Sequence, residues 1–439
     1  MKNESIYKKI LVVSFPLIIQ GVVFQLQSLT DKIFLGRLDT GFVSAVGTAQ
    51  MPFNAIADTL VAITIGVTIL VSHYFGEKRK DSIFALAKSS IIFHSLFGIL
   101  FFCLWQFFPH TILSFFHIDA SIVSYALSYV KICSWYFIVL AFDAVIQNTF
   151  QGMGKTNILM YESIIKVFLN IILSYYFIYG PPKMNVQGAA WGTVLANYIS
   201  FAFIFICWQK EKIVQKWNLL KKEKVLDFYP YIQVVKLGLP IGIEFLLWHI
   251  SNLILIRFIN DFSYVHMAIY SFTSAIQCIF LVVYKGIAQG TIPLIGQSLG
   301  QKNTELCKIY YKKAFILTSI IVVLSGLLIF VFPTFFLQFF TKDKALILQG
   351  LTFIRWLPFI MLGQNINVLC GNVLRAYGNT TFSLYLQILG STVTISLSYI
   401  FIFKLNMDMN AIYLTVFIDE GIRGIINFFY CKKYTNKKQ

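Results

Sequence analysis

Apolar runs long enough to cross a lipid bilayer recur along the whole sequence, separated by short polar and basic breaks. A membrane-spanning helix needs about 20 mostly apolar residues, and each run reaches or exceeds that length. The pattern therefore predicts an all-α integral membrane protein with twelve transmembrane helices. The predicted spans lie near residues 10–36, 42–73, 88–109, 122–150, 158–180, 186–208, 232–259, 264–299, 314–340, 346–374, 382–404 and 408–430.

The two halves of the sequence repeat the same landmarks at one offset. Pro16 and Pro240 lie in the first and seventh predicted spans, 224 residues apart (240 − 16). The same offset separates Gly76 from Gly300, Gly154 from Gly378, and the Leu-Ser-Tyr run at 173–175 from the one at 397–399. Because each half has six spans, the repeat predicts two pseudo-symmetric six-helix bundles related by an axis along the membrane normal.

The repeat also predicts the domain boundaries. The N-lobe covers residues 1–208, a Lys-rich cytoplasmic linker covers 209–231, and the C-lobe covers 232–439. In transporters built from such repeats the substrate path lies at the repeat interface.

Composition agrees with a protein whose solvent is largely lipid. Only 13% of the residues are charged, against about 25% in soluble proteins. The net charge of +17 lies in clusters between apolar runs, where it sets topology, so no nucleic-acid partner is expected. The seven cysteines are scattered without a CxxC pair, which predicts neither a disulfide framework nor a metal site.

The distribution of Lys and Arg predicts the orientation. These residues are concentrated in alternate loops, which include both termini, the 209–231 linker and the loop that begins at Arg375. Since positive loops stay in the cytoplasm, both termini are expected there, with the chain crossing the cell (plasma) membrane many times. The first apolar run is too long for a cleaved signal peptide and is expected to remain as the first helix.

Short motifs, in order along the chain, resemble the multidrug and toxic compound extrusion (MATE) family. After Pro16, residues 31–38 (DKIFLGRL) are similar to the family's D-x-x-x-x-G-x-L pattern. Residues 151–156 (QGMGKT) resemble its R-G-x-G-D-T turn, 188–193 (GAAWGT) its sixth-helix opening and 295–300 (IGQSLG) the end of its eighth helix. The resemblance implies a non-enzymatic antiporter for multidrug efflux, which exports small amphipathic, often cationic compounds by alternating access, driven by H⁺ or Na⁺.

Asp31 is the candidate for ion coupling. An acid inside a membrane span is costly and is a functional candidate by default, and a carboxylate can bind and release a cation. The resemblance places Asp31 at the family's helix-one aspartate and implies that polar groups of spans four to six complete the site: Gln147, Asn170, Ser174 and Thr193. Some family members carry a second aspartate where Ser174 stands, so H⁺ and Na⁺ both stay open. Alternatively, Asp31 is an interfacial residue near the helix end.

Two further acids are candidates for a substrate cavity in the N-lobe. Asp58 lies near the middle of the second span and Asp143 near the middle of the fourth. Their negative potential would attract a cationic substrate, and the alternative is a helix-to-helix hydrogen bond. Asn367 in the tenth span is a cavity candidate of the C-lobe.

The C-lobe also carries Glu244 in span seven and Lys285 in span eight. A buried lysine needs a partner, so these two are predicted to pair, either for structure or as a coupling element that breaks during transport. Asp419, Glu420 and Arg423 in span twelve can pair at i, i+3 or i+4 and are interpreted as structural.

Pro16 removes a backbone hydrogen bond within the first span. The resemblance implies a hinge there, because the family bends its first helix, and a static kink is the alternative. The expected partners are small-molecule substrates and the bilayer, the chain is expected to be a monomer, and no cofactor beyond the coupling H⁺ or Na⁺ is expected. Two other classes compete: a lipid-linked oligosaccharide flippase of the same superfamily, and a membrane-embedded enzyme, for which no catalytic constellation is apparent.

Overall fold

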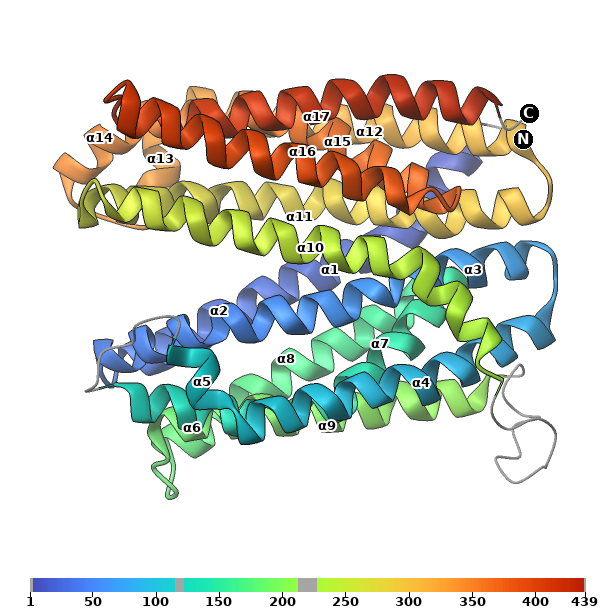
Figure 1. Cartoon of the computed structure of the whole chain (residues 1–439), viewed down its shortest axis with the longest axis horizontal. Coiled ribbons are helices and arrows are strands. Elements are labelled where there is room, and N and C mark those ends of the chain that lie inside the picture. Colours follow the sequence, from blue (N-terminus) through green and yellow to red (C-terminus); the bar gives the residue numbers. More distant parts are fainter. Residues whose placement is uncertain (1–2, 115–121, 212–226, 438–439) are drawn as a thin grey trace. The chain divides into compact units, whose positions relative to one another are not determined.

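A computed structural model describes residues 3–114, 122–211 and 227–437 (Figure 1). Within these ranges the chain is helical apart from short turns and contains no strand, which confirms the predicted fold class. Contacts divide the chain into two compact units. One, which we call the N-unit, is Ile19–Gly242, and the other, the C-unit, combines Met1–Ile18 with Ile243–Gln439.

The N-unit is built from eight helices of its own among the described residues. They are α2 (Thr40–Ile63), α3 (Ile65–Gly76), α4 (Lys80–Phe107), α5 (Pro109–Ser114), α6 (Val123–Cys133), α7 (Tyr136–Gly152), α8 (Thr156–Tyr179) and α9 (Asn185–Lys210). Within it, α8 packs along α9, and α7 packs against α3 and α4. Two long helices, α1 (Asn3–Gly36) and α10 (Tyr229–Asn260), contribute residues to both units.

The C-unit repeats this order of helices. Its elements are α11 (Tyr264–Gly300), α12 (Thr304–Val331), α13 (Pro333–Gln338), α14 (Lys344–Ile354), α15 (Leu357–Ala376), α16 (Thr380–Tyr399), the π-helical turn η1 (Ile400–Lys404) and α17 (Asn410–Lys437). Here α15 packs against α11, α12 and α17, and α16 lies beside α17 (Figure 1).

Helix boundaries follow the 224-residue offset that the sequence predicts. The helices α4 and α12 begin at Lys80 and Thr304, and α8 and α16 also begin 224 residues apart. The turns before α8 and α16 contain Gly154 and Gly378, whose φ values are 77° and 79°. Glycine adopts this left-handed conformation without the strain that a side chain would add, so both repeats use glycine to end a span sharply.

The division by contacts differs from the predicted lobe boundaries. In α1 it falls after Ile18, two residues beyond Pro16, and in α10 after Gly242, two residues beyond Pro240. The start of α1 therefore belongs to the C-unit and the start of α10 to the N-unit. Most of the predicted linker at 209–231 lies outside the described residues, and the role of Pro16 as a hinge stays a prediction.

Close helix packing explains why the start of α1 belongs to the C-unit and the start of α10 to the N-unit. In the N-unit a Cβ on Gly238 of α10 would lie 1.9 Å from the carbonyl oxygen of Ile63, so the two backbones touch. In the C-unit a Cβ on Gly290 of α11 would lie 2.3 Å from Ser14 Oγ of α1. Small residues permit such close approach between membrane helices, and they attach each helix start to its unit.

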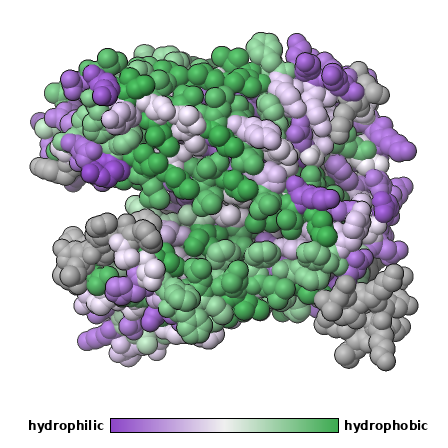
Figure 2. All heavy atoms as spheres, viewed as in Figure 1, coloured by the Kyte–Doolittle hydropathy of each residue, from purple (hydrophilic) through white to green (hydrophobic). Residues whose placement is uncertain are grey.

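Length and hydropathy support a multi-pass membrane protein. Among the described residues, ten helices are long and apolar enough to cross a bilayer, and the pair α6–α7, bent by 46°, forms an eleventh candidate. The remaining predicted span, α17, carries Asp419, Glu420 and Arg423 close together, which lowers its apolar character. In each unit, hydrophobic side chains cover the middle of the helices and hydrophilic ones gather near their ends (Figure 2).

Candidate functional site

The N-unit contains a cavity of about 260 Å³ between α1, α2, α7 and α8. Its wall is partly aromatic, from Phe24, Phe53 and Tyr136. The two acids predicted from the sequence, Asp58 and Asp143, both line it. Ligand pockets usually measure roughly 300–1,000 Å³, so this cavity suits a compact molecule.

Charged and amide side chains form a network beside this cavity. Lys166 Nζ lies 2.9 Å from Glu162 Oε1 and 3.7 Å from Asp143 Oδ2. Gln147 donates to Asp143 Oδ2 at 2.8 Å and to Glu162 Oε2 at 3.4 Å. Gln147 also accepts a hydrogen bond from Gln20 of α1 at 3.2 Å. We call these five side chains the N-centre.

The acids of the N-centre are removed from solvent. Asp143 is 3% exposed and Glu162 is 0% exposed. Ionised carboxylates are tolerated in such places only when they are paired, and Lys166 supplies the pairing charge. The sequence analysis missed Glu162 and Lys166. The signal that could have found them is an acid and a base four residues apart within an otherwise apolar span.

Asp31 is buried in α1, with 8% of its surface exposed. Its Oδ1 has no hydrogen-bond partner in the part of the chain that the structure describes. Tyr129 and Cys133 of α6 lie within electrostatic range of it. A buried carboxylate with an unused oxygen can accept a proton or a cation, so the predicted coupling role fits this environment.

Of the four polar partners implied for Asp31, the structure brings three together. Asn170 of α8 donates to Thr193 Oγ1 at 3.0 Å and to Ser174 Oγ at 3.4 Å, and its Oδ1 is buried without a partner. Oxygen atoms of this kind suit a hard cation. Gln147 belongs to the N-centre instead, because it lies one turn after Asp143. No hydrogen bond between described residues joins Asp31 to these four, and their shared role stays a prediction.

In the C-unit Glu244 forms an ion pair with Arg375. Glu244 Oε1 accepts from Arg375 Nη2 at 2.5 Å, and the two side chains are 18% and 11% exposed. The sequence analysis placed Arg375 in a cytoplasmic loop, but α15 continues to Ala376 and carries the guanidinium back into the helix bundle. The predicted pairing of Glu244 with Lys285 of α11 stays a prediction.

Replacing Glu244 by Gln should lower the free energy of unfolding by about 2 kcal/mol, because Arg375 would keep its charge in a largely buried place without a counter-ion. The matched control is Arg257→Gln. Arg257 pairs with Asp261 at a site where both side chains are largely exposed, so its loss should cost less than about 1 kcal/mol. Thermal unfolding in detergent measures both, and equal effects would contradict the assignment.

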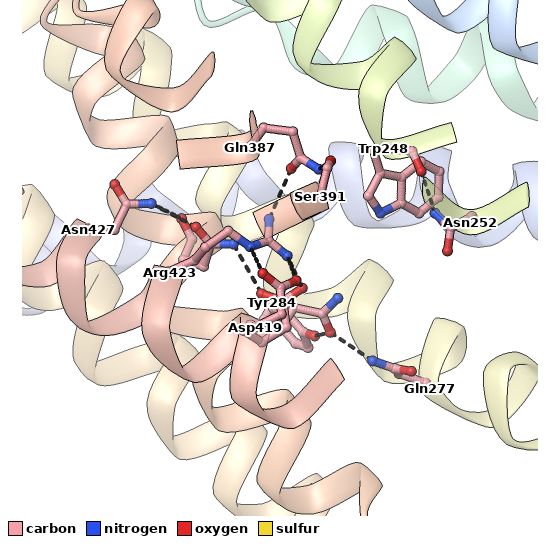
Figure 3. Close-up of polar contacts among 12 residues, drawn as sticks. Trp248, Asn252, Gln277, Tyr284, Gln387, Ser391, Asp419, Arg423 and Asn427 are labelled. Carbon is pink, nitrogen blue, oxygen red and sulfur yellow. Dashed lines mark hydrogen bonds and ion pairs between the residues drawn. The ribbon is translucent and has the colours of Figure 1, made fainter. Parts of the chain in front are cut away.

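A second charged network, the C-centre, surrounds Arg423 of α17 (Figure 3). Arg423 donates from Nε and Nη2 to the two oxygens of Asp419 at 2.8 and 2.5 Å, and from Nη1 to Gln387 at 3.0 Å. Its Nη2 also lies 3.1 Å from Glu420 Oε1. Asn367 of α15 donates to Glu420 Oε2 at 3.0 Å. The pairing within span twelve agrees with the structural interpretation of these residues.

Asn367, predicted as a cavity residue, forms hydrogen bonds through both the nitrogen and the oxygen of its side-chain amide. Its nitrogen donates to Glu420, and its Oδ1 accepts from Asn427 Nδ2 at 2.7 Å. The geometry therefore gives Asn367 a bridging position between α15 and α17. A contact with substrate stays a prediction.

The MatE family model matches residues 16–176 and again residues 240–400, which are the two repeats. A probable multidrug resistance protein NorM of Thermotoga maritima is 23% identical over 86% of this chain and 81% of its own length. An uncharacterized transporter, YisQ of Bacillus subtilis, is 22% identical over 94% of this chain and 92% of its own length.

Solved structures share the fold. An outward-facing multidrug resistance MATE family transporter of the MOP superfamily superposes with a TM-score of 0.90 at 19% identity, covering 98% of this chain and 96% of the other. A MATE structure in a bent conformation superposes with a TM-score of 0.89 at 20% identity, covering 100% and 98%. At this level of identity the similarity supports the fold, while the chemistry must come from the residues of this chain.

Proposed function

The chain belongs to the MatE family of membrane transporters and is not an enzyme, and from this premise we propose that it exports small amphipathic cations in exchange for H⁺ or Na⁺. The observation that carries the proposal is the N-unit cavity, which is lined by Asp58, Asp143 and Lys166, with Glu162 paired to Lys166 beside it. An excess of carboxylates in a low-dielectric site attracts positive charge. Several relatives, NorM of Thermotoga maritima among them, carry names of multidrug resistance proteins, which supports a xenobiotic substrate.

The coupling ion would bind at Asp31, whose buried carboxylate has an unused oxygen. Alternating access of two lobes would expose the cavity to either side of the plasma membrane, with both termini in the cytoplasm. A single chain holds both repeats, so a monomer is sufficient. The carboxylate excess disfavours a flippase for lipid-linked oligosaccharides, because a pyrophosphate group would need a cationic cavity.

Expression in a bacterial strain that lacks its own efflux pumps tests the proposal. Energised cells that carry the chain should accumulate several-fold less ethidium than cells with the empty vector, because the cavity suits a compact aromatic cation. Dissipating the proton and sodium gradients should abolish the difference. Equal ethidium accumulation with and without the chain, repeated with a fluoroquinolone, would reject drug export and turn attention to lipid flipping.

A further inference from the structure

The repeat places a buried cation at corresponding positions of the two units. The 224-residue offset relates Lys166 to Gly390 (390 − 166) and Asp143 to Asn367 (367 − 143). Gly390 has no side chain, and a Cβ built on it would lie 2.5 Å from Arg423 Nε. The guanidinium of Arg423 therefore lies over the position in the C-unit that Lys166 occupies in the N-unit.

We call the C-centre closed, because each carboxylate oxygen of Asp419 and Glu420 has a partner. Asp419 binds Arg423 through both of its oxygens, and Glu420 uses one oxygen for Arg423 and the other for Asn367. A guanidinium keeps its charge at every physiological pH and binds in a fixed fork. The C-centre thus has the properties of a permanent structural cluster.

We call the N-centre open, because one carboxylate oxygen of Asp143 has no hydrogen-bond partner among the described residues. Asp143 Oδ1 is buried, has no hydrogen-bond partner among the described residues and belongs to a side chain that lines the cavity. Lys166 lies 3.7 Å from Asp143, which is longer than a hydrogen bond. Since Asp143 and Glu162 share one ammonium, the N-centre has one negative charge in excess. A buried charge without compensation is strongly unfavourable, so a further positive charge is expected there.

The neighbours of the N-centre favour a proton as that charge. Tyr136 on α7 lies within electrostatic range of the two acids, of Lys166 and of Asp58 on α2, and Asp58 adds negative potential. A hard metal cation requires about six oxygen ligands, and the ammonium of Lys166 would repel it. A proton requires only the free oxygen of Asp143.

We propose that Asp143 and Glu162 form a proton-exchange site with Lys166 as its built-in counter-ion. When a cationic substrate leaves the cavity, one proton binds the carboxylate of Asp143 and replaces the lost positive charge. When the next substrate binds, the carboxylic acid releases that proton. The site is separate from Asp31, and its role in transport depends on the export function proposed above.

Infrared difference spectroscopy of the reconstituted full chain tests proton binding without any substrate. Spectra between acidic and alkaline buffers should show a titrating carboxylic-acid band in the wild type. Asp143→Asn and Glu162→Gln should each remove or shift that band. Glu420→Gln, which removes a buried carboxylate of the closed C-centre, should leave it unchanged. A band that is unaltered in both N-centre variants would overturn the proposal.

Transport assays test whether this site couples transport to protons. In proteoliposomes Asp143→Asn, which resembles the permanently protonated site, should reduce ethidium transport driven by a pH gradient by about tenfold or more, and the remaining transport should no longer respond to the gradient. Ethidium transport that responds to the pH gradient in this variant as it does in the wild type would overturn the proposal. Absence of transport by the wild type would instead reject the export function, and the infrared result would still decide whether the proton site exists.

Discussion

Replacing Asp31 by Asn should reduce ion-driven transport of substrate in proteoliposomes by roughly a hundredfold, because a lost charge-assisted contact is worth about 3 kcal/mol. The carboxylate is buried and its Oδ1 has no hydrogen-bond partner in the described chain. The isosteric amide should therefore preserve the fold while it removes the charge that is proposed to hold the coupling ion. Transport should be measured with a proton gradient and with a sodium gradient separately, since the gradient that loses its effect identifies the ion.

Asp39→Asn provides the matched control for this variant. Asp39 lies eight residues further along, is exposed, and caps α2 by accepting a hydrogen bond from the backbone N–H of Gly41 at 2.7 Å. Asparagine is an equally good helix cap, so transport should stay at the wild-type level. Coupled transport that survives Asp31→Asn would remove this residue from the mechanism, whatever the control shows.

The fold could be predicted from the sequence because lipid imposes a simple rule on span length, and because the repeat leaves glycines at fixed positions. Gly154 and Gly378 adopt the same left-handed turn in both halves, and α4 and α12 begin at the corresponding residues. The division of α1 and α10 between two units could not be predicted. It depends on backbone contacts, such as the one between Gly238 and Ile63, that no periodicity reveals.

The candidate site was predicted less completely. Hydropathy identifies an acid within a span but not the direction of its side chain, so Gln147 was grouped with Asp31 although it binds Asp143. Lys166 was overlooked because the apolar residues around it dominate the average of its span. Arg375 was placed in a loop because α15 extends beyond the apolar run that predicted it. For Gln147 and Lys166 the missing information is which helix face meets which neighbour, and for Arg375 it is the residue at which the helix ends.

Replacing Arg423 by Leu should lower the free energy of unfolding by about 3–5 kcal/mol, the cost of leaving buried carboxylates without a partner. Asp419 and Glu420 are 6% and 8% exposed, and both depend on this guanidinium. Thermal unfolding in detergent would measure the loss. Replacing all three residues together by apolar ones of similar volume should restore much of the stability, because the desolvation penalty disappears with the charges.

Because Lys166 and Gly390 occupy corresponding positions of the two repeats, a lysine at position 390 provides a second test of the role of Arg423. If both centres need a cation at one place in the repeat, Gly390→Lys should recover part of the stability that Arg423→Leu removes, since an ammonium from α16 would then face Asp419 and Glu420. In the presence of Arg423, Gly390→Lys should instead destabilise the protein, because its Cβ would lie 2.5 Å from Nε. This opposite sign is the coupling that a double-mutant cycle detects. Additive losses in the double variant would show that a cation is not required at this position. The two units would then correspond there in backbone structure but not in charge.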